Sequence, residues 1–129
     1  MKILGIDYGR KKIGIAVGDT ETKLIDLVKT VPNLQFTIYN LQTIINDQKI
    51  QKIIIGIPGG KMDEEIRLFG ERLKKETNLP VEFFDETLTT QDAQDILIKS
   101  GRSRKSRKQK EDAIAAAIML VYYIEARLC

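Results

Sequence analysis

Two strand-like segments joined by a tight turn fill the first nineteen residues and constrain the fold more than any other stretch. Residues 2–6 (K-I-L-G-I) and 12–17 (K-I-G-I-A-V) are rich in β-branched side chains, which favour strands. Residues 8–11 (Y-G-R-K) join them as a turn in which Gly9 can adopt a positive φ. Asp7 stands where the first strand ends. It can hold a metal ion above the sheet or be an ordinary turn residue, and this stretch alone leaves both interpretations open.

The rest of the chain alternates between helical and strand-like patterns. We expect a third strand at 23–31, a helix at 34–48 capped by Asn33, a buried strand at 52–57, a helix at 63–77, a strand at 79–84, a helix from 89 or 90 to 100, and a last helix at about 111–127. This order predicts an α/β fold with a mixed five-stranded sheet flanked by helices, in which three antiparallel strands come first and later strands are joined through helices. The 129 residues fit a single domain, 1–129.

The composition excludes several classes of site. The chain has no histidine and one cysteine, Cys129. Catalytic triads, Cys–His pairs, HExxH zinc sites and a disulfide framework are therefore excluded, and any chemistry must rest on carboxylates, hydroxyls, Lys, Arg and a bound metal. Asp7 and Arg10 interrupt the apolar start, and no apolar run approaches the roughly 20 residues of a membrane-spanning helix. We expect a cytoplasmic protein without a membrane partner.

Positive charge is concentrated in one short segment. The net charge is +3, but six of the 21 basic residues and none of the 18 acidic residues lie in 102–110 (R-S-R-K-S-R-K-Q-K). The remainder of the chain is therefore net negative. We interpret the segment as a basic loop that contacts a polyanion, with nucleic acid a better fit than a small acidic ligand. The alternative is a solvated, flexible run of charge.

Three acidic residues stand at the ends of predicted elements. Asp7 ends the first strand, Glu86 follows the fifth strand with Asp85 beside it, and Asp112 opens the last helix directly after the basic loop. If the first and fifth strands run parallel and near each other, these carboxylates can converge at one edge of the sheet. Three converging carboxylates need a cation, and their oxygens suit Mg²⁺ or Mn²⁺. Each acid also has a plain interpretation, as a turn residue, a loop charge or a partner of the helix dipole.

Four segments in order resemble a known family. They are I-L-G-I-D-Y-G-R-K-K-I-G-I-A-V-G-D at 3–19, I-I-I-G-I-P at 53–58, F-D-E-T-L-T-T at 84–90 and R-K-Q-K-E-D-A-I-A-A-A-I-M-L at 107–120. With these segments the chain resembles the YqgF/RuvX family, a branch of the ribonuclease H-like nucleases, over nearly its whole length. Two departures are visible. Thr87 stands where the family usually has Arg, and residues 59–64 (G-G-K-M-D-E) replace a Met-Asp-Gly turn.

The resemblance implies a ribonuclease H-like fold and a divalent-metal nuclease. Its matched acids are Asp7, Glu86 and Asp112, which would hold Mg²⁺ or Mn²⁺ and hydrolyse phosphodiester bonds. The family is associated with 5′-end maturation of the 16S ribosomal RNA precursor, so precursor rRNA is the favoured partner and ribosomal precursor particles are possible ones. The alternatives are a Holliday junction resolvase acting on branched DNA and a non-catalytic nucleic-acid-binding module of ribosome assembly. The oligomeric state stays open.

Basic residues on both sides of the expected site are candidates for phosphate contacts. They are Arg10, Lys11, Lys12, Lys105, Arg107 and Lys108. The segment 102–110 has no aromatic residue, so Tyr8 is the candidate for base stacking. ATP-binding proteins of the actin and sugar-kinase group share a similar opening hairpin, but they need a second domain for which 129 residues leave no room.

Overall fold

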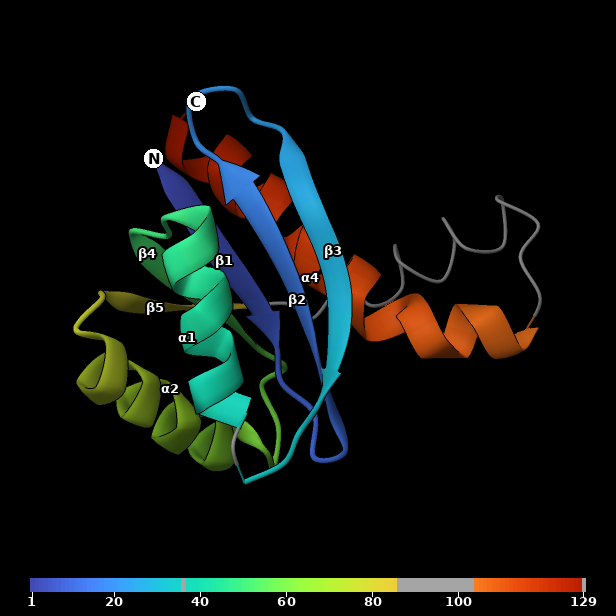
Figure 1. Ribbon diagram of the computed structural model, residues 1–129. Helices are drawn as coiled ribbons and strands as arrows, with labels where there is room; N and C mark the ends of the chain where they lie inside the picture. The colour runs from blue at the N-terminus through green and yellow to red at the C-terminus, as the bar shows by residue number, and fades with distance from the viewer. Residues whose placement is uncertain (36, 86–103, 129) are drawn as a thin grey trace.

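The computed structural model describes residues 1–35, 37–85 and 104–128, and a mixed five-stranded sheet lies at its centre (Figure 1). Its elements are β1 (Lys2–Asp7), β2 (Lys12–Asp19), β3 (Ile25–Pro32), α1 (Thr37–Gln48), β4 (Lys52–Ile57), α2 (Asp63–Thr77), β5 (Val81–Asp85) and α4 (Arg104–Leu128). Within these described residues, no helix is long and apolar enough to cross a membrane.

The strand order is β3-β2-β1-β4-β5. β2 pairs antiparallel with both β1 and β3, whereas β1 pairs parallel with β4 and β4 parallel with β5. The predicted mixed sheet is therefore confirmed, with β4 lying between the first and fifth strands. Because β1, β4 and β5 run in one direction, they end at the same edge of the sheet, at Asp7, Ile57 and Asp85. We call this the carboxyl edge.

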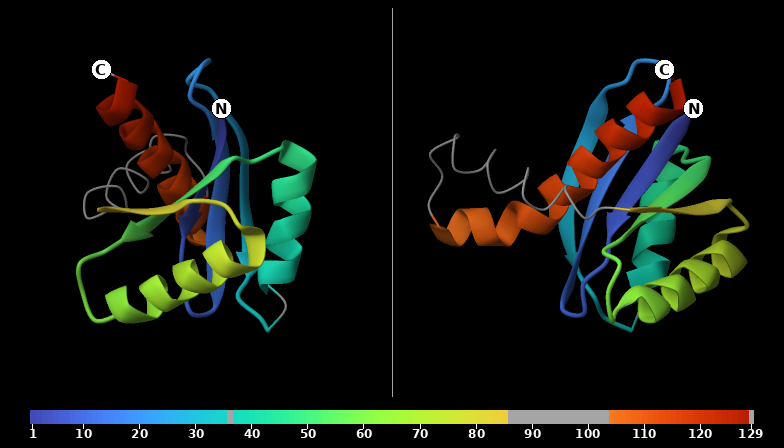
Figure 2. Two further views of the ribbon diagram at one scale, coloured as in Figure 1. Left: turned by 90° about the vertical axis from the view of Figure 1, so that its left-hand side faces the viewer. Right: turned by 180° about the vertical axis from the view of Figure 1, so that it is seen from behind.

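Helices cover both faces of the sheet. α1 and α2 lie on one face and α4 on the other (Figure 2). Leu4 and Ile6 of β1 pack in the core under α1 and α2, and Ile3 packs in the core under α4. Because side chains alternate along a strand, Asp7 points to the face that α4 covers. Only glycine fits at position 5 on this face, since a Cβ there would lie 2.5 Å from Leu120 Cγ.

The last helix begins earlier than the sequence analysis predicts. α4 starts at Arg104, so the prediction of a loop over 104–110 is wrong. Lys, Arg and Gln are good helix formers, and no Gly or Pro interrupts 104–110, so a run of charge does not exclude a helix. The first turns of α4 extend past β3, beyond the edge of the sheet (Figures 1 and 2). The predicted helix ending at residue 100 lies outside the described residues.

The start of α1 also differs from the prediction. The helix begins at Thr37, and Asn33 does not cap it. The Asn33 side-chain amide instead donates a hydrogen bond of 2.6 Å to the Gly9 carbonyl. The buried Thr37 hydroxyl accepts a hydrogen bond from the Leu34 amide at 2.6 Å and donates one to the Pro32 carbonyl at 2.9 Å. Thr37 therefore fixes the path of the chain from β3 into α1.

Candidate functional site at the carboxyl edge

Asp7 has the position that the sequence predicts, at the carboxyl edge. It is half-buried and ends β1 opposite Gly14 of β2. β4 separates β1 from β5. The register places Ile57, at the end of β4, beside Asp85, at the end of β5. Asp7 and the end of β5 therefore lie at the same edge. Glu86, the next residue along the chain, lies outside the described residues.

Asp112 has a different local setting from the one predicted. Its backbone lies well inside α4 and not at the start of the helix, because α4 begins at Arg104. The structure describes neither its side chain nor those of Lys105, Arg107 and Lys108. Over residues 1–35, 37–85 and 104–128, no three His, Cys, Asp or Glu side chains that the structure describes form a metal-binding group. The convergence of Asp7, Glu86 and Asp112 stays a prediction.

The turn between β1 and β2 is tied to α2 through Glu65. The Tyr8 hydroxyl donates a hydrogen bond of 2.8 Å to Glu65 Oε2, and Arg10 Nε donates one of 3.2 Å to Oε1. The Tyr8 ring also packs against Phe69, with ring centroids 4.9 Å apart. Glu65 was not predicted as a site residue, and it is one of three acids in the first turn of α2. Its partners lie more than 50 residues away, so no local pattern distinguishes it from Asp63 and Glu64.

Burial raises the pKa of the Tyr8 hydroxyl, and the hydrogen bond to the Glu65 carboxylate raises this pKa further. Tyr8 therefore stays protonated near neutral pH and remains a hydrogen-bond donor. Arg10 keeps 70% of its side chain exposed while it pairs with Glu65. Since an exposed ion pair is weak, a phosphate group can compete with Glu65 for the guanidinium of Arg10.

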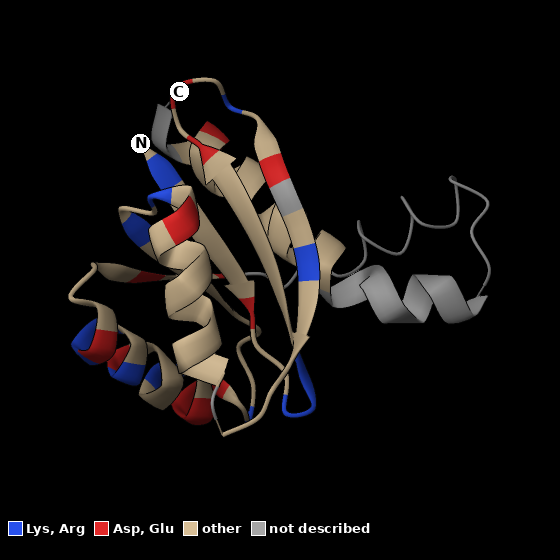
Figure 3. Ribbon diagram, in the orientation of Figure 1, with Lys and Arg blue, Asp and Glu red and all other residues tan. Residues whose placement is uncertain are grey.

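Asn33 holds the turn from the other side. Its side-chain amide donates to the Gly9 carbonyl, and its backbone amide donates a hydrogen bond of 2.9 Å to the Lys11 carbonyl. A Cβ at position 9 would lie 2.5 Å from the Lys12 carbonyl oxygen, so only glycine fits there. The turn is thus held at fixed points by α2 and by the segment before α1. The turn is also basic, as its blue colour shows (Figure 3), and Lys11 is exposed.

The loop after β4 lies at the same edge. Gly59 adopts a φ of 82°, a conformation that favours glycine. The backbone amides of Gly59 and Gly60 donate hydrogen bonds of 3.0 and 3.2 Å to Asp63 Oδ1, so the first residue of α2 satisfies them. The carboxylate of Asp63 therefore fixes the loop that connects the end of β4 to α2.

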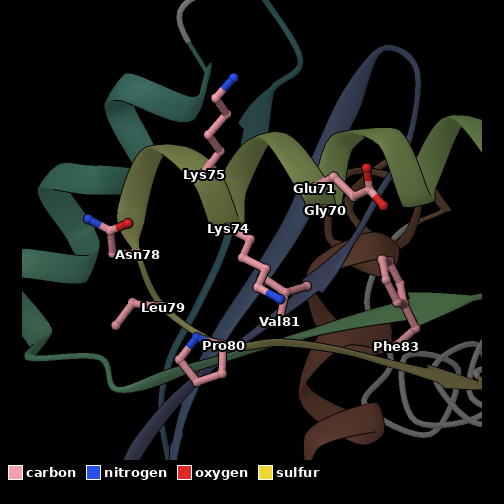
Figure 4. Close-up of a pocket in the computed structure, with 9 residues that line it drawn as sticks. All are labelled: Gly70, Glu71, Lys74, Lys75, Asn78, Leu79, Pro80, Val81 and Phe83. Atoms are coloured by element: carbon pink, nitrogen blue, oxygen red, sulfur yellow. The ribbon is translucent and has the colours of Figure 1, made fainter.

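A separate pocket of about 750 Å³ lies between α2 and the start of β5 (Figure 4). Its lining includes Lys74 and Lys75 of α2 and the backbone that leads from Asn78 into Val81. This pocket is near the amino end of β5, away from Asp7. It is therefore not part of the candidate site at the carboxyl edge.

A model of the RuvX family, described as Holliday junction resolvase, matches residues 1–126. The chain belongs to the RuvX family. A relative from Heliobacterium modesticaldum named "Putative pre-16S rRNA nuclease" is 36% identical over 98% of this chain and 91% of that protein. Another of the same name, from Clostridioides difficile, is 35% identical over 98% of this chain and 96% of its own length. The resemblance seen in the sequence is confirmed.

Solved structures of resolvases share the fold. RuvC from T. thermophilus in complex with a Holliday junction substrate superimposes with a TM-score of 0.63 and 17% identity over 99% of this chain and 96% of that one. The fowlpox virus resolvase, also with Holliday junction DNA, gives a TM-score of 0.64 and 18% identity over the full length of both chains. The expected ribonuclease H-like fold is thereby confirmed. The descriptions of the family and of the relatives support nuclease function as a general property of this RuvX member.

Proposed function

We propose that residues 1–129 form one metal-dependent endonuclease domain that hydrolyses phosphodiester bonds in 5′-end maturation of the 16S rRNA precursor. The observation that carries the proposal is the position of Asp7, at the carboxyl edge beside a basic turn that two hydrogen-bond networks hold in place. The name of the curated relatives supports the RNA substrate, and membership of the RuvX family supports nuclease action in general.

The proposed metal ligands are Asp7, Glu86 and Asp112. All three offer carboxylate oxygens, which suit Mg²⁺ or Mn²⁺, and the chain has no histidine for a competing nitrogen site. The fit rests on Asp7, whose half-buried side chain is on the face that α4 covers, while α4 also carries Asp112. A bound divalent ion would lower the pKa of a bound water and stabilise charge on the phosphoryl oxygens.

Basic residues would hold the substrate backbone. At the hairpin these are Arg10 and Lys11 of the turn and Lys12, the first residue of β2. On the first turns of α4 they are Lys105, Arg107 and Lys108. Contacts of this kind position a strand without reading its sequence. The turn is close to Asp7 along the chain, so phosphates bound there would lie near the proposed reaction centre.

The Asp7→Asn variant tests the proposal. The substitution keeps the shape of the side chain and removes its negative charge, so we expect Mg²⁺- or Mn²⁺-dependent cleavage of precursor rRNA to fall by at least about a hundredfold. Asp26→Asn on β3 is the matched control and should cleave as wild type does. Thermal unfolding should show that both variants are folded. Cleavage by Asp7→Asn at the wild-type rate would refute the proposed site.

A Holliday junction resolvase is the second candidate. The specific observation in its favour is the full-length structural similarity to two resolvases that were solved with junction DNA. A resolvase cuts two strands symmetrically, so this function predicts a dimer in solution. A non-catalytic ribosome-assembly module is distinguished by metal titration, since it predicts no divalent-ion binding that depends on Asp7.

A further inference from the structure

A second pocket, of about 210 Å³, lies on the other face of the sheet from Asp7, beside the same turn. The side chain of Tyr8 points to the α1 and α2 face because it alternates with Asp7, and it forms part of the wall. Leu34 lines the pocket from the segment before α1, and Leu68 and Arg72 line it from α2. Tyr8, which lines this pocket, directly follows Asp7, a proposed metal ligand, in the chain.

The walls of this pocket combine aromatic and aliphatic groups. Tyr8 is packed against Phe69, which fixes its ring. Leu34 is 68% exposed and Leu68 is 60% exposed, although both are large apolar side chains. The two leucines, on different elements, give the pocket an apolar rim that a flat apolar group can contact.

Polar groups supply the larger part of the accessible lining of this pocket. Glu65 accepts hydrogen bonds from Tyr8 and Arg10, and a carboxylate has further acceptor sites on its two oxygens. Asn33 and Gln35 add amide groups to the lining, and Arg72 adds an exposed positive charge. The lining can therefore contact a flat, apolar face and also the polar edge of the same ligand.

We propose that this pocket receives the base of one unpaired nucleotide. The inference rests on the proposed function, since the nucleotide would belong to the strand whose phosphates lie on Arg10 and Lys11. The volume is below the roughly 300–1,000 Å³ of pockets that hold drug-sized ligands, which fits a single flat ring and not a whole nucleotide. The basic turn matches the charge of the backbone that must run past the pocket.

The consequence is a preference for unpaired strands near the cleavage position. A base in a duplex is paired and stacked and cannot enter a side pocket, whereas a single-stranded base can be splayed out and packed against side chains. The pocket would thus distinguish single-stranded nucleic acid from duplex without reading its sequence. This property deepens the proposed function by defining the state of the strand that the enzyme binds.

Binding without turnover tests this inference. Fluorescence anisotropy with EDTA present compares a short single-stranded RNA with an abasic strand of the same length. We expect wild type to bind the strand with bases about tenfold more tightly than the abasic strand, because packing one base against side chains contributes about that much affinity. The double variant Leu34→Ala/Leu68→Ala should lose this preference, yet bind the abasic strand as wild type does. Leu24→Ala is the matched control, an equally exposed leucine in the loop between β2 and β3.

The outcomes separate the pocket from the proposed function. Equal binding of the two strands by wild type would contradict the pocket and leave the nuclease proposal intact. The proposed role of the pocket would also be contradicted if Leu34→Ala/Leu68→Ala kept the wild-type preference for the strand with bases over the abasic strand. Failure of wild type to bind either strand would contradict both proposals. Because both leucines are largely exposed, thermal unfolding of the double variant should match that of Leu24→Ala.

Discussion

At the scale of single residues, Tyr8 connects the proposed reaction centre at Asp7 to helix α2. It follows Asp7, donates a hydrogen bond to Glu65 and packs on Phe69, so its side chain determines how the turn lies against α2. Neither contact has a local sequence signal, because the bond to Glu65 spans 57 residues. The sequence could therefore identify Asp7 and the basic turn, but not the network that holds them.

The raised pKa of Tyr8 predicts a pH dependence of stability. The folded protein favours the protonated hydroxyl, so its stabilising effect is complete below the ordinary tyrosine pKa of 10.0 and is lost as the pH rises through the higher pKa of the folded state. Tyr8→Phe removes this effect and the hydrogen bond, which should lower the free energy of unfolding by about 1 kcal/mol near neutral pH.

Urea unfolding of wild type and Tyr8→Phe from pH 8 to 11 measures this difference. The gap between the two proteins should shrink at the alkaline end of this range. Tyr39→Phe is the control, since Tyr39 is 72% exposed on α1. A gap that stays constant across the range, or grows with pH, would show that the hydroxyl of Tyr8 does not titrate as described.

At the scale of elements, α2 packs closely on β5 at Gly70. A Cβ at this position would lie 2.6 Å from Cζ of Phe83, and Figure 4 shows the two residues on facing elements. The sequence indicates only that Gly70 lowers helix propensity. The structure gives the reason for its presence, which is the close approach of the helix to the Phe83 ring.

Gly70→Ala should therefore destabilise the protein although alanine is the better helix former. We expect the free energy of unfolding to fall by about 1–3 kcal/mol, because an added methyl group must displace Phe83. Glu71→Ala, the adjacent exposed position on the same helix, should change it by less than about 0.5 kcal/mol. Chemical denaturation of both variants decides the matter, and a stabilised Gly70→Ala protein would mean that Phe83 moves without cost.

The bounds of a helix or strand can be predicted from the sequence when a local pattern of side chains determines them. The strand at 52–57 and the helix at 63–77 have the predicted bounds, because a continuous β-branched run and a clear helical period define them locally. The prediction of a loop over 104–110 is wrong because charge density says little about helix formation by Lys and Arg. The capping role given to Asn33 was wrong because its partner, Gly9, is distant in the sequence.

At the scale of the whole molecule, one edge of the sheet collects the ends of three parallel strands and a basic turn. The topology that the sequence predicts is enough to place Asp7 there. The topology does not place the other two proposed metal ligands, because Glu86 and the side chain of Asp112 lie outside the described residues. The first turns of α4 add a second group of basic residues beyond the sheet.

These basic residues predict the salt dependence of nucleic-acid binding. The triple variant Lys105→Gln/Arg107→Gln/Lys108→Gln should reduce the slope of log K against log salt concentration by about two units, at about 0.7 for each lost contact with a single strand. The control variant Lys49→Gln/Lys74→Gln/Lys75→Gln removes the same charge from exposed positions elsewhere and should keep most of the slope. Equal slopes for the two variants would remove the α4 residues from the interface.

Cleavage of two substrates side by side tests the central claim most directly. Purified wild-type protein is incubated with the 16S rRNA precursor and with a four-way DNA junction, each with Mn²⁺ and with EDTA. We predict cleavage of the RNA near its mature 5′ end with Mn²⁺ only, and little or no cleavage of the junction. Symmetric cutting of the junction with the RNA left intact would contradict the rRNA assignment, and equal RNA cleavage with EDTA would contradict metal dependence.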